Sequence, residues 1–183
     1  MTPTDDHADD RTTDRTPSRA TSRTRLNALG AELHAIHRGL RAELTRLRTE
    51  VAAHLAGHGP RPRELRAHCL AFCAALTTHH TGEDAGAFPA LAAAHPELRP
   101  VIAKLTEDHG LIAGILRSLD QLLTGLPDHP TPAEATRIQG ELDGLAAILE
   151  SHFGFEERRI TAALDALPAS AGTPVTLLGA PPG

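Results

Sequence analysis

Apolar residues recur every three or four positions along four long stretches of this chain, which is the period of a helix that buries one face. The stretches predict helices over residues 26–55, 62–88, 100–124 and 132–167. Glycine and proline end helices, and they follow these stretches at Gly57, Gly59 and Pro60, at Pro89, at Gly125 and Pro127, and at Pro168. The alternation typical of strands is missing from all four stretches, so each should form a separate helical rod.

Four rods joined by short connections predict an all-α fold, an up-down-up-down four-helix bundle over residues 24–167. The start of the last rod is marked by Thr131, Pro132 and Glu134, which form a capping box with proline in the first helical turn. Residues 1–23 are polar and almost free of apolar side chains, so we expect a disordered tail. Residues 168–183 read as a flexible tail despite one short apolar patch.

Composition narrows the class of protein further. The 183 residues suit one domain, and with no Tyr or Trp and only four Phe, leucine and alanine must fill the core. A formal charge of −5 without a basic cluster gives no basis for nucleic-acid binding. No apolar run approaches the roughly 20 residues of a membrane span, and the polar N-terminus lacks the apolar segment of a secretory signal. We therefore expect a cytoplasmic protein that binds neither nucleic acid nor membrane.

Each of the four apolar stripes contains one histidine, and two of these histidines are followed four residues later by a glutamate. An unpaired carboxylate or charged imidazole in a dry core is destabilising by several kcal/mol, and a buried metal would relieve that penalty. Residues four apart share a helix face, so each HxxxE pair can present a nitrogen and an oxygen to the same metal. The candidate metal ligands are His37, His79, Glu83, His109, His152 and Glu156.

Four nitrogens and two carboxylates suffice for two metal ions if Glu83 and Glu156 bridge them. Mixed imidazole and carboxylate ligation favours iron, with manganese and zinc as alternatives. His34 lies toward the polar edge of its helix, whereas His37 is flanked by leucines. His34, His80 and Glu157, which follows Glu156, remain open as additional ligands. His80 and Asp84 lie about 100° around the helix from His79 and Glu83 and are better interpreted as outer or surface groups.

Other bundle proteins provide alternatives to this interpretation. A ferritin-like carboxylate site needs Glu-x-x-His, whereas here histidine precedes glutamate at a spacing of four. A zinc hydrolase would be expected to carry H-E-x-x-H, which is missing. A bundle with ordinary core histidines and no metal is the remaining alternative, and four helices with one histidine each on the buried stripe argue against it.

These motifs resemble the hemerythrin-like, or HHE cation-binding, domain family over roughly residues 25–165. The resemblance depends on AIHRGLRAEL around His37, LTTHHTGEDAGAFPAL around His79 and Glu83, LTEDHGLI around His109, and LESHFGFEERRI around His152 and Glu156. It implies a bundle of hemerythrin type that holds non-haem iron, usually as a pair, and reacts with dioxygen, peroxide or nitric oxide.

The chain departs from the oxygen-carrying members of that family at two positions. Their third helix carries a second histidine where this chain has Ala113, and their last motif is HxxxxD where this chain has HxxxE. The pattern is similar to the bacterial H-HxxxE-H-HxxxE subgroup. The resemblance therefore implies an oxidoreductase that uses a small oxidant and an electron donor, rather than an oxygen carrier. A sensor or sink for dioxygen, nitric oxide or iron is one alternative, and a di-iron oxidase or oxygenase of a biosynthetic pathway is another.

Overall fold

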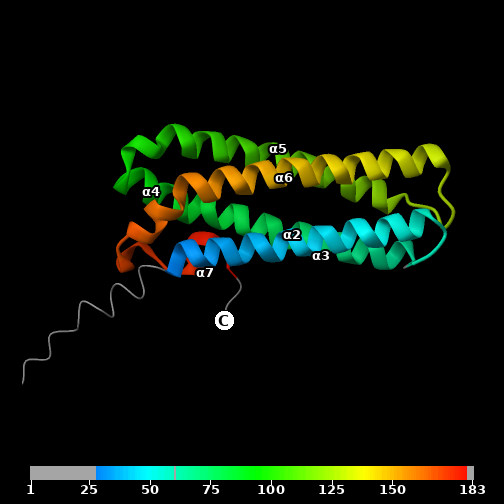
Figure 1. The fold of residues 1–183 in the computed structure, drawn as a ribbon, viewed down its shortest axis with the longest axis horizontal. Helices are drawn as coiled ribbons and strands as arrows, with labels where there is room; N and C mark the ends of the chain where they lie inside the picture. The colour runs from blue at the N-terminus through cyan, green and yellow to red at the C-terminus, as the bar shows by residue number, and fades with distance from the viewer. Residues whose placement is uncertain (1–27, 60, 181–183) are drawn as a thin grey trace, which may run out of the picture.

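The computed structural model describes residues 28–59 and 61–180, and within them the chain is helical without any strand. Four long helices dominate, and shorter helical segments connect α3 to α5 and follow α6 (Figure 1). The all-α prediction is therefore confirmed, with more helical segments than the four predicted. The predicted disordered tail, residues 1–23, lies outside the described residues. The elements are α2 (Ala28–Leu55), α3 (Pro62–Gly82), η1 (Glu83–Ala87), α4 (Phe88–Ala94), η2 (Pro96–Leu98), α5 (Arg99–Thr124), α6 (Pro132–Ala166), η3 (Ala169–Ala171) and α7 (Pro174–Leu178).

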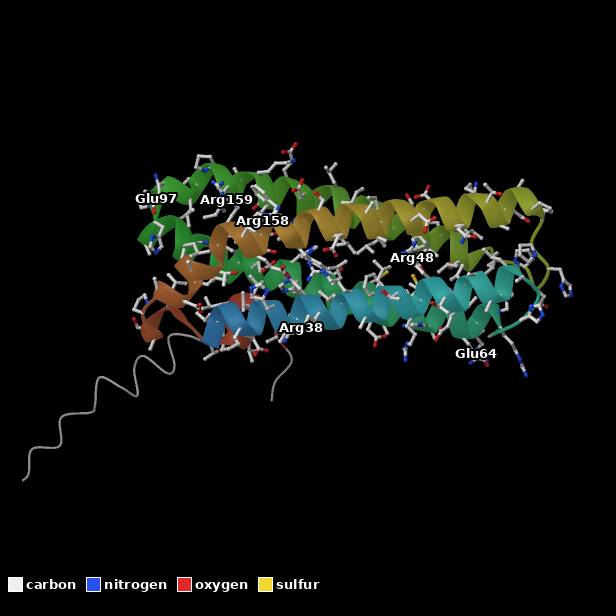
Figure 2. All side chains as sticks on the ribbon, in the orientation of Figure 1. Arg38, Arg48, Glu64, Glu97, Arg158 and Arg159 are labelled. Carbon is white, nitrogen blue, oxygen red and sulfur yellow. The ribbon has the colours of Figure 1, made fainter. Side chains whose placement is uncertain are left out.

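The long helices lie side by side in a closed arrangement. Helix α2 packs against α3 and α6, and α5 packs against the same two helices. The α2–α3 and α5–α6 connections lie at one end of the molecule, whereas α4 and α7 lie toward the other end (Figure 1). Arg38 and Arg158 are exposed, and Arg48, labelled between α2 and α6, pairs with Asp143 of α6 (Figure 2). None of the helices in the described part of the chain is long and apolar enough to cross a membrane.

Two apolar clusters fill the interior, one toward each end of the rods. In α2, Leu40 and Leu47 belong to the first cluster, and Leu29 and Leu33 to the second. The same change of cluster occurs in the stretch α3 to α4 and in α5 and α6. On each rod the candidate ligands lie where the apolar seam passes from one cluster to the other, so they share one polar layer inside the bundle.

The second predicted stretch, residues 62–88, does not stop before Pro89, contrary to the prediction. A π-helical segment, η1, follows α3, and the N–H of Phe88 donates to the carbonyl of Glu83 five residues back. Proline lacks an N–H and disrupts a regular helix interior. Here it lies at the start of α4, directly after the wider π turn. Such single π turns are often found at functional sites, and this one begins at a candidate ligand.

The prediction of a flexible C-terminal tail is wrong for residues 168–180. Thr173 caps α7, and Leu177, Leu178 and Ala180 are buried. The short apolar patch in this segment completes the second apolar cluster, together with residues from α2, η1 and α6. Burial of its leucines offsets part of the entropy cost of ordering the segment, and the cap at Thr173 and the hydrogen bond from His79 to Leu178 stabilise it further.

Candidate metal centre

All six predicted ligands meet in the polar layer between the two apolar clusters, and His80 joins them. His37, Glu83 and Glu156 are fully buried, and none of the other four is more than 6% exposed. One group of potential ligand atoms comes from His37, His79, Glu83 and Glu156. A second group comes from His80, His109 and His152.

The first group brings His37 of α2 and His79 of α3 together. Their Nε2 atoms are 3.0 Å apart. The other ring nitrogen of His79, Nδ1, donates to the carbonyl oxygen of Leu178 at 2.9 Å, because a carbonyl can only accept. The Nδ1 of His37 likewise donates to the Glu157 carboxylate at 2.9 Å. With both Nδ1 atoms protonated, the two neutral rings point their Nε2 lone pairs at each other.

Two facing lone pairs at this distance repel each other unless a cation lies between them. Two nitrogens bound to one metal at right angles, with bonds of about 2.1 Å, would lie about 3.0 Å apart. A proton is a poor substitute for the metal, because burial lowers the pKa of His37 far below its usual range and that of His79 to about 4. The geometry therefore fits a shared metal ion.

The second group is built from three rings on three helices. The rings of His80 and His109 stack with centroids 3.9 Å apart and an interplanar angle of 7°. His152 meets both rings edge-on. The Nδ1 of His109 is 3.0 Å from Asp84, which leaves Nε2 free to bind a metal. Burial lowers the pKa of His109 and of His152 to about 4, so both rings are neutral ligands near pH 7.

The two glutamates connect the groups. Oε2 of Glu83 lies 3.5 Å from Nε2 of His79 in the first group and 3.6 Å from Nε2 of His109 in the second. Oε2 of Glu156 lies 3.4 Å from Nε2 of His37 and 3.7 Å from Nε2 of His152. Each carboxylate is therefore near a histidine of both groups, which is the position of a bridging ligand between two metals.

Many atoms of this layer are buried without a hydrogen-bond partner among the described residues. They are Nε2 of His80 and His109, both ring nitrogens of His152, and both carboxylate oxygens of Glu83 and Glu156. A single unsatisfied buried polar group destabilises a protein by about 1–3 kcal/mol, so such a collection is not expected in a structure that holds nothing there. Two metal ions would satisfy the Nε2 atoms and the carboxylate oxygens, whereas Nδ1 of His152 lies 3.9 Å from Asp108. The donor set suits iron.

Burial also acts on the carboxylates. It raises the pKa of Glu83 well above its usual range, with the charge of Glu156 as the next cause. It raises the pKa of Glu156 to about 8. Without a cation these glutamates would be largely protonated near neutral pH. Metal binding must therefore displace protons from them.

A charged network on the α2–α6 side holds His37 from outside. Glu157, which accepts from His37, also accepts from the guanidinium of Arg41 at 2.8 Å. Arg41 bonds Glu150 as well and lies over the ring of Phe153, which stacks on His37 at 4.0 Å. Outer carboxylates of this kind orient a ligand ring and strengthen its donor nitrogen.

His80 was placed by the sequence among the outer or surface groups, and the structure buries it in the second ligand group instead. His79 and His80 lie about 100° apart around α3, too far apart to aim at one ion. The centre is wide enough for two ions, so the neighbouring rings can serve different groups. Two features of the sequence could have indicated that His80 faces the centre: the His79-His80 doublet and the small residue Ala113. Ala113 lines the same cavity as His80 and His109.

The other open residues take outer positions. The His34 side chain is 41% exposed and only approaches Glu157, at 3.7 Å. Glu157 and Asp84 each hold a ligand histidine through Nδ1. The cavity beside His80 and His109 lies between α3 and α5, has a volume of about 260 Å³, and is lined by Thr77, Thr81, Asp84, Thr106, Gly110, Ala113 and Leu116 in addition to the two histidines.

Comparison with known families agrees with this geometry. The family model of the hemerythrin HHE cation-binding domain matches residues 29–164, a range that contains all seven buried histidines and glutamates of the polar layer. Searches of curated proteins and of solved structures give no match. The match covers most of the chain, and the layer has the histidine and glutamate donors that a cation-binding domain requires. The chain therefore belongs to the hemerythrin HHE cation-binding domain family.

Proposed function

We propose that this protein is a di-iron redox protein that reacts with a small oxidant, namely peroxide, dioxygen or nitric oxide. His37 and His79 would hold one iron, and His80, His109 and His152 the other. The observation that supports the pairing best is the position of the two glutamates, each within 3.7 Å of a histidine from both groups. Glu83 and Glu156 would bridge the two ions.

The donor set favours iron over the alternatives. A structural zinc site closes with four ligands, whereas seven side chains converge here. Imidazole with carboxylate is common to iron and manganese sites, and iron is the usual metal of the family to which the chain belongs. Manganese therefore remains the closest alternative, and zinc is disfavoured by the number of donors.

The two metal positions are not equivalent. With both glutamates bridging, the position at His37 and His79 has one protein ligand fewer than the position at the three histidines. The two-histidine position would therefore keep more open coordination sites, and a small oxidant would reach the centre through the cavity beside His80 and His109. Bound iron would act as Lewis acid and electron reservoir, while Glu157 and Leu178 would hold the rings of His37 and His79.

The space around the centre favours a small reactant over a bulky substrate. Sites for organic ligands usually have volumes of about 300–1,000 Å³, and the cavity beside His80 and His109 measures about 260 Å³. Polar side chains such as Thr77, Thr81 and Thr106 line it. This supports reaction with a small oxidant more than the oxygenase alternative.

We further propose that the long helices form an up-down-up-down bundle of the H-HxxxE-H-HxxxE subgroup.

Iron analysis combined with stopped-flow spectroscopy tests the proposal. The purified chain should contain two irons, and addition of peroxide should change the iron absorption bands and consume peroxide over repeated cycles when a reductant is supplied. His109→Ala should abolish this reaction. His58→Ala, an exposed histidine of the α2–α3 connection, should leave it unchanged. A tight stoichiometric adduct without turnover would favour a sensor or sink, and a chain without iron would refute the proposal.

A further inference from the structure

The C-terminal segment 174–180 packs directly against the metal layer. Helix α7 contacts α2, α3 and η1, and the Leu178 carbonyl accepts from Nδ1 of His79 at 2.9 Å in a buried position. We propose that this segment is a positioning strap for the two-histidine metal, with Leu178 as the positioning residue. The inference depends on the proposed function, because it assigns a role at the more open of the two iron positions.

The strap reaches the ligand because glycines allow the two backbones to approach. A Cβ on Gly82 of α3 would lie 2.2 Å from the backbone nitrogen of Gly179. A Cβ on Gly86 would lie 2.3 Å from the carbonyl oxygen of Thr176, and one on Gly179 would lie 2.2 Å from that of Thr78. Gly179 also has a φ of +59°, a left-handed conformation that favours glycine. Side chains at these positions would separate the strap from the helix.

The hydrogen bond to Leu178 determines which nitrogen of His79 can bind metal. A carbonyl oxygen accepts only, so Nδ1 must carry the proton and Nε2 presents its lone pair to the centre. The rings of His37 and His109 use carboxylates as outer partners instead, Glu157 of α6 and Asp84 of η1. Of these three rings, only His79 depends on the segment that follows α6, and it serves the position with fewer protein ligands.

The strap also covers the centre from one side. Leu177 and Leu178 are at most 2% exposed and belong to the second apolar cluster. The cavity beside His80 and His109 lies between α3 and α5, whereas the strap packs against α2, α3 and η1. The strap therefore shields the His37 and His79 side of the layer from solvent, and separating it should loosen one iron and not the other.

Two variants, Gly82→Ala and Gly179→Ala, undock the strap from opposite sides, and Gly39→Ala is the control. Gly39 lies in α2 two residues from His37, and an added Cβ there meets nothing within 4 Å. Circular dichroism should show helical content like that of the wild type for all three. The measurement is the rate at which an iron chelator removes each of the two irons, together with the Mössbauer spectrum of the loaded chain.

Removing an outer partner of a ligand usually weakens metal affinity about 10–100-fold, so we expect both strap variants to release one iron faster by a similar factor. One Mössbauer doublet should change and the other should not. Gly39→Ala should behave like the wild type. If both irons leave at wild-type rates, or if both release rates rise equally, the strap has no specific role and the inference is wrong. The proposed function is not affected by that result as long as the wild type holds two irons. A variant that does not fold is replaced by the other variant, which tests the same contact.

Discussion

Replacing His80 with alanine should affect the metal-free and iron-loaded proteins differently. In the metal-free chain the imidazole is buried with Nε2 lacking a partner among the described residues, a state destabilising by about 1–3 kcal/mol. Deletion relieves that penalty but removes the packing of the ring on His109 at 3.9 Å. Core deletions destabilise by about 2–5 kcal/mol for large aliphatic side chains. The relief offsets only part of the lost packing, so the free energy of unfolding without metal should fall by about 1–2 kcal/mol, less than for an ordinary core deletion.

In the iron-loaded chain the same substitution removes one of three nitrogens from one ion. Ligand binding to the folded state stabilises it by mass action, and each tenfold loss of affinity removes about 1.4 kcal/mol of that stabilisation. His80→Ala should therefore lose at least that much stability relative to the loaded wild type. The iron content should fall toward one ion per chain, with the remaining ion at His37 and His79.

Chemical denaturation with and without iron, under anaerobic conditions, measures both effects. Leu119→Ala is the control, because Leu119 is fully buried in the first apolar cluster, away from the polar layer. Deleting a packing residue of this kind should destabilise both states alike, by about 2–5 kcal/mol. If His80→Ala behaves like Leu119→Ala and still binds two irons, His80 is a packing residue and the reasoning is refuted.

Three further predictions follow from the surroundings of the ligands. Glu157→Gln should lower the affinity for the iron at His37 about 10–100-fold, measured by chelator competition. Glu150→Gln changes a partner of Arg41 but no ligand contact, so it should have little effect. Equal losses of affinity in the two variants would contradict the proposed role of Glu157. In the metal-free protein, His79, His109 and His152 have a pKa of about 4, below that of histidine in the unfolded chain. Between pH 6.5 and about 4 the unfolded imidazoles therefore bind protons that the folded ones do not. Urea denaturation should show that the free energy of unfolding falls as the pH drops through this range. Glu156 has a pKa of about 8 in the folded metal-free protein, so the wild type should lose stability as the pH rises from about 4.5 through 8. Glu156→Gln should remove this pH dependence and also abolish bridging. A variant with the pH profile of the wild type would argue against a buried carboxyl at this position.

The apolar period and the HxxxE pairs were enough to predict the helical fold and to select six of the seven side chains that the polar layer gathers. Those residues could be selected because a polar ligand on a buried helix face interrupts a regular apolar pattern. His80 could not be selected in this way, because the helical period assigns one inward-facing direction to each helix. A layer that holds two metals accepts two neighbouring rings from α3. The π turn at Glu83 could not be predicted either, because it depends on how Pro89 is accommodated once α4 packs.

The C-terminal strap shows a different limit of sequence reasoning. Segment 168–183 is rich in glycine, proline and alanine, a composition that suggests a flexible tail when taken alone. The packing of residues 174–180 depends on Gly82 and Gly86, about 90 residues earlier, which leave room for the backbone at Thr176 and Gly179. A pairing of small residues so far apart has no local signature, so only the packed structure reveals it.

The most direct test of the two-metal account is a crystal structure of the iron-loaded protein with anomalous diffraction at the iron edge. We predict two anomalous peaks in the polar layer, one at His37 and His79 and one at His80, His109 and His152, with Glu83 and Glu156 between them. A single peak, or iron bound elsewhere while these side chains bond one another, would contradict it.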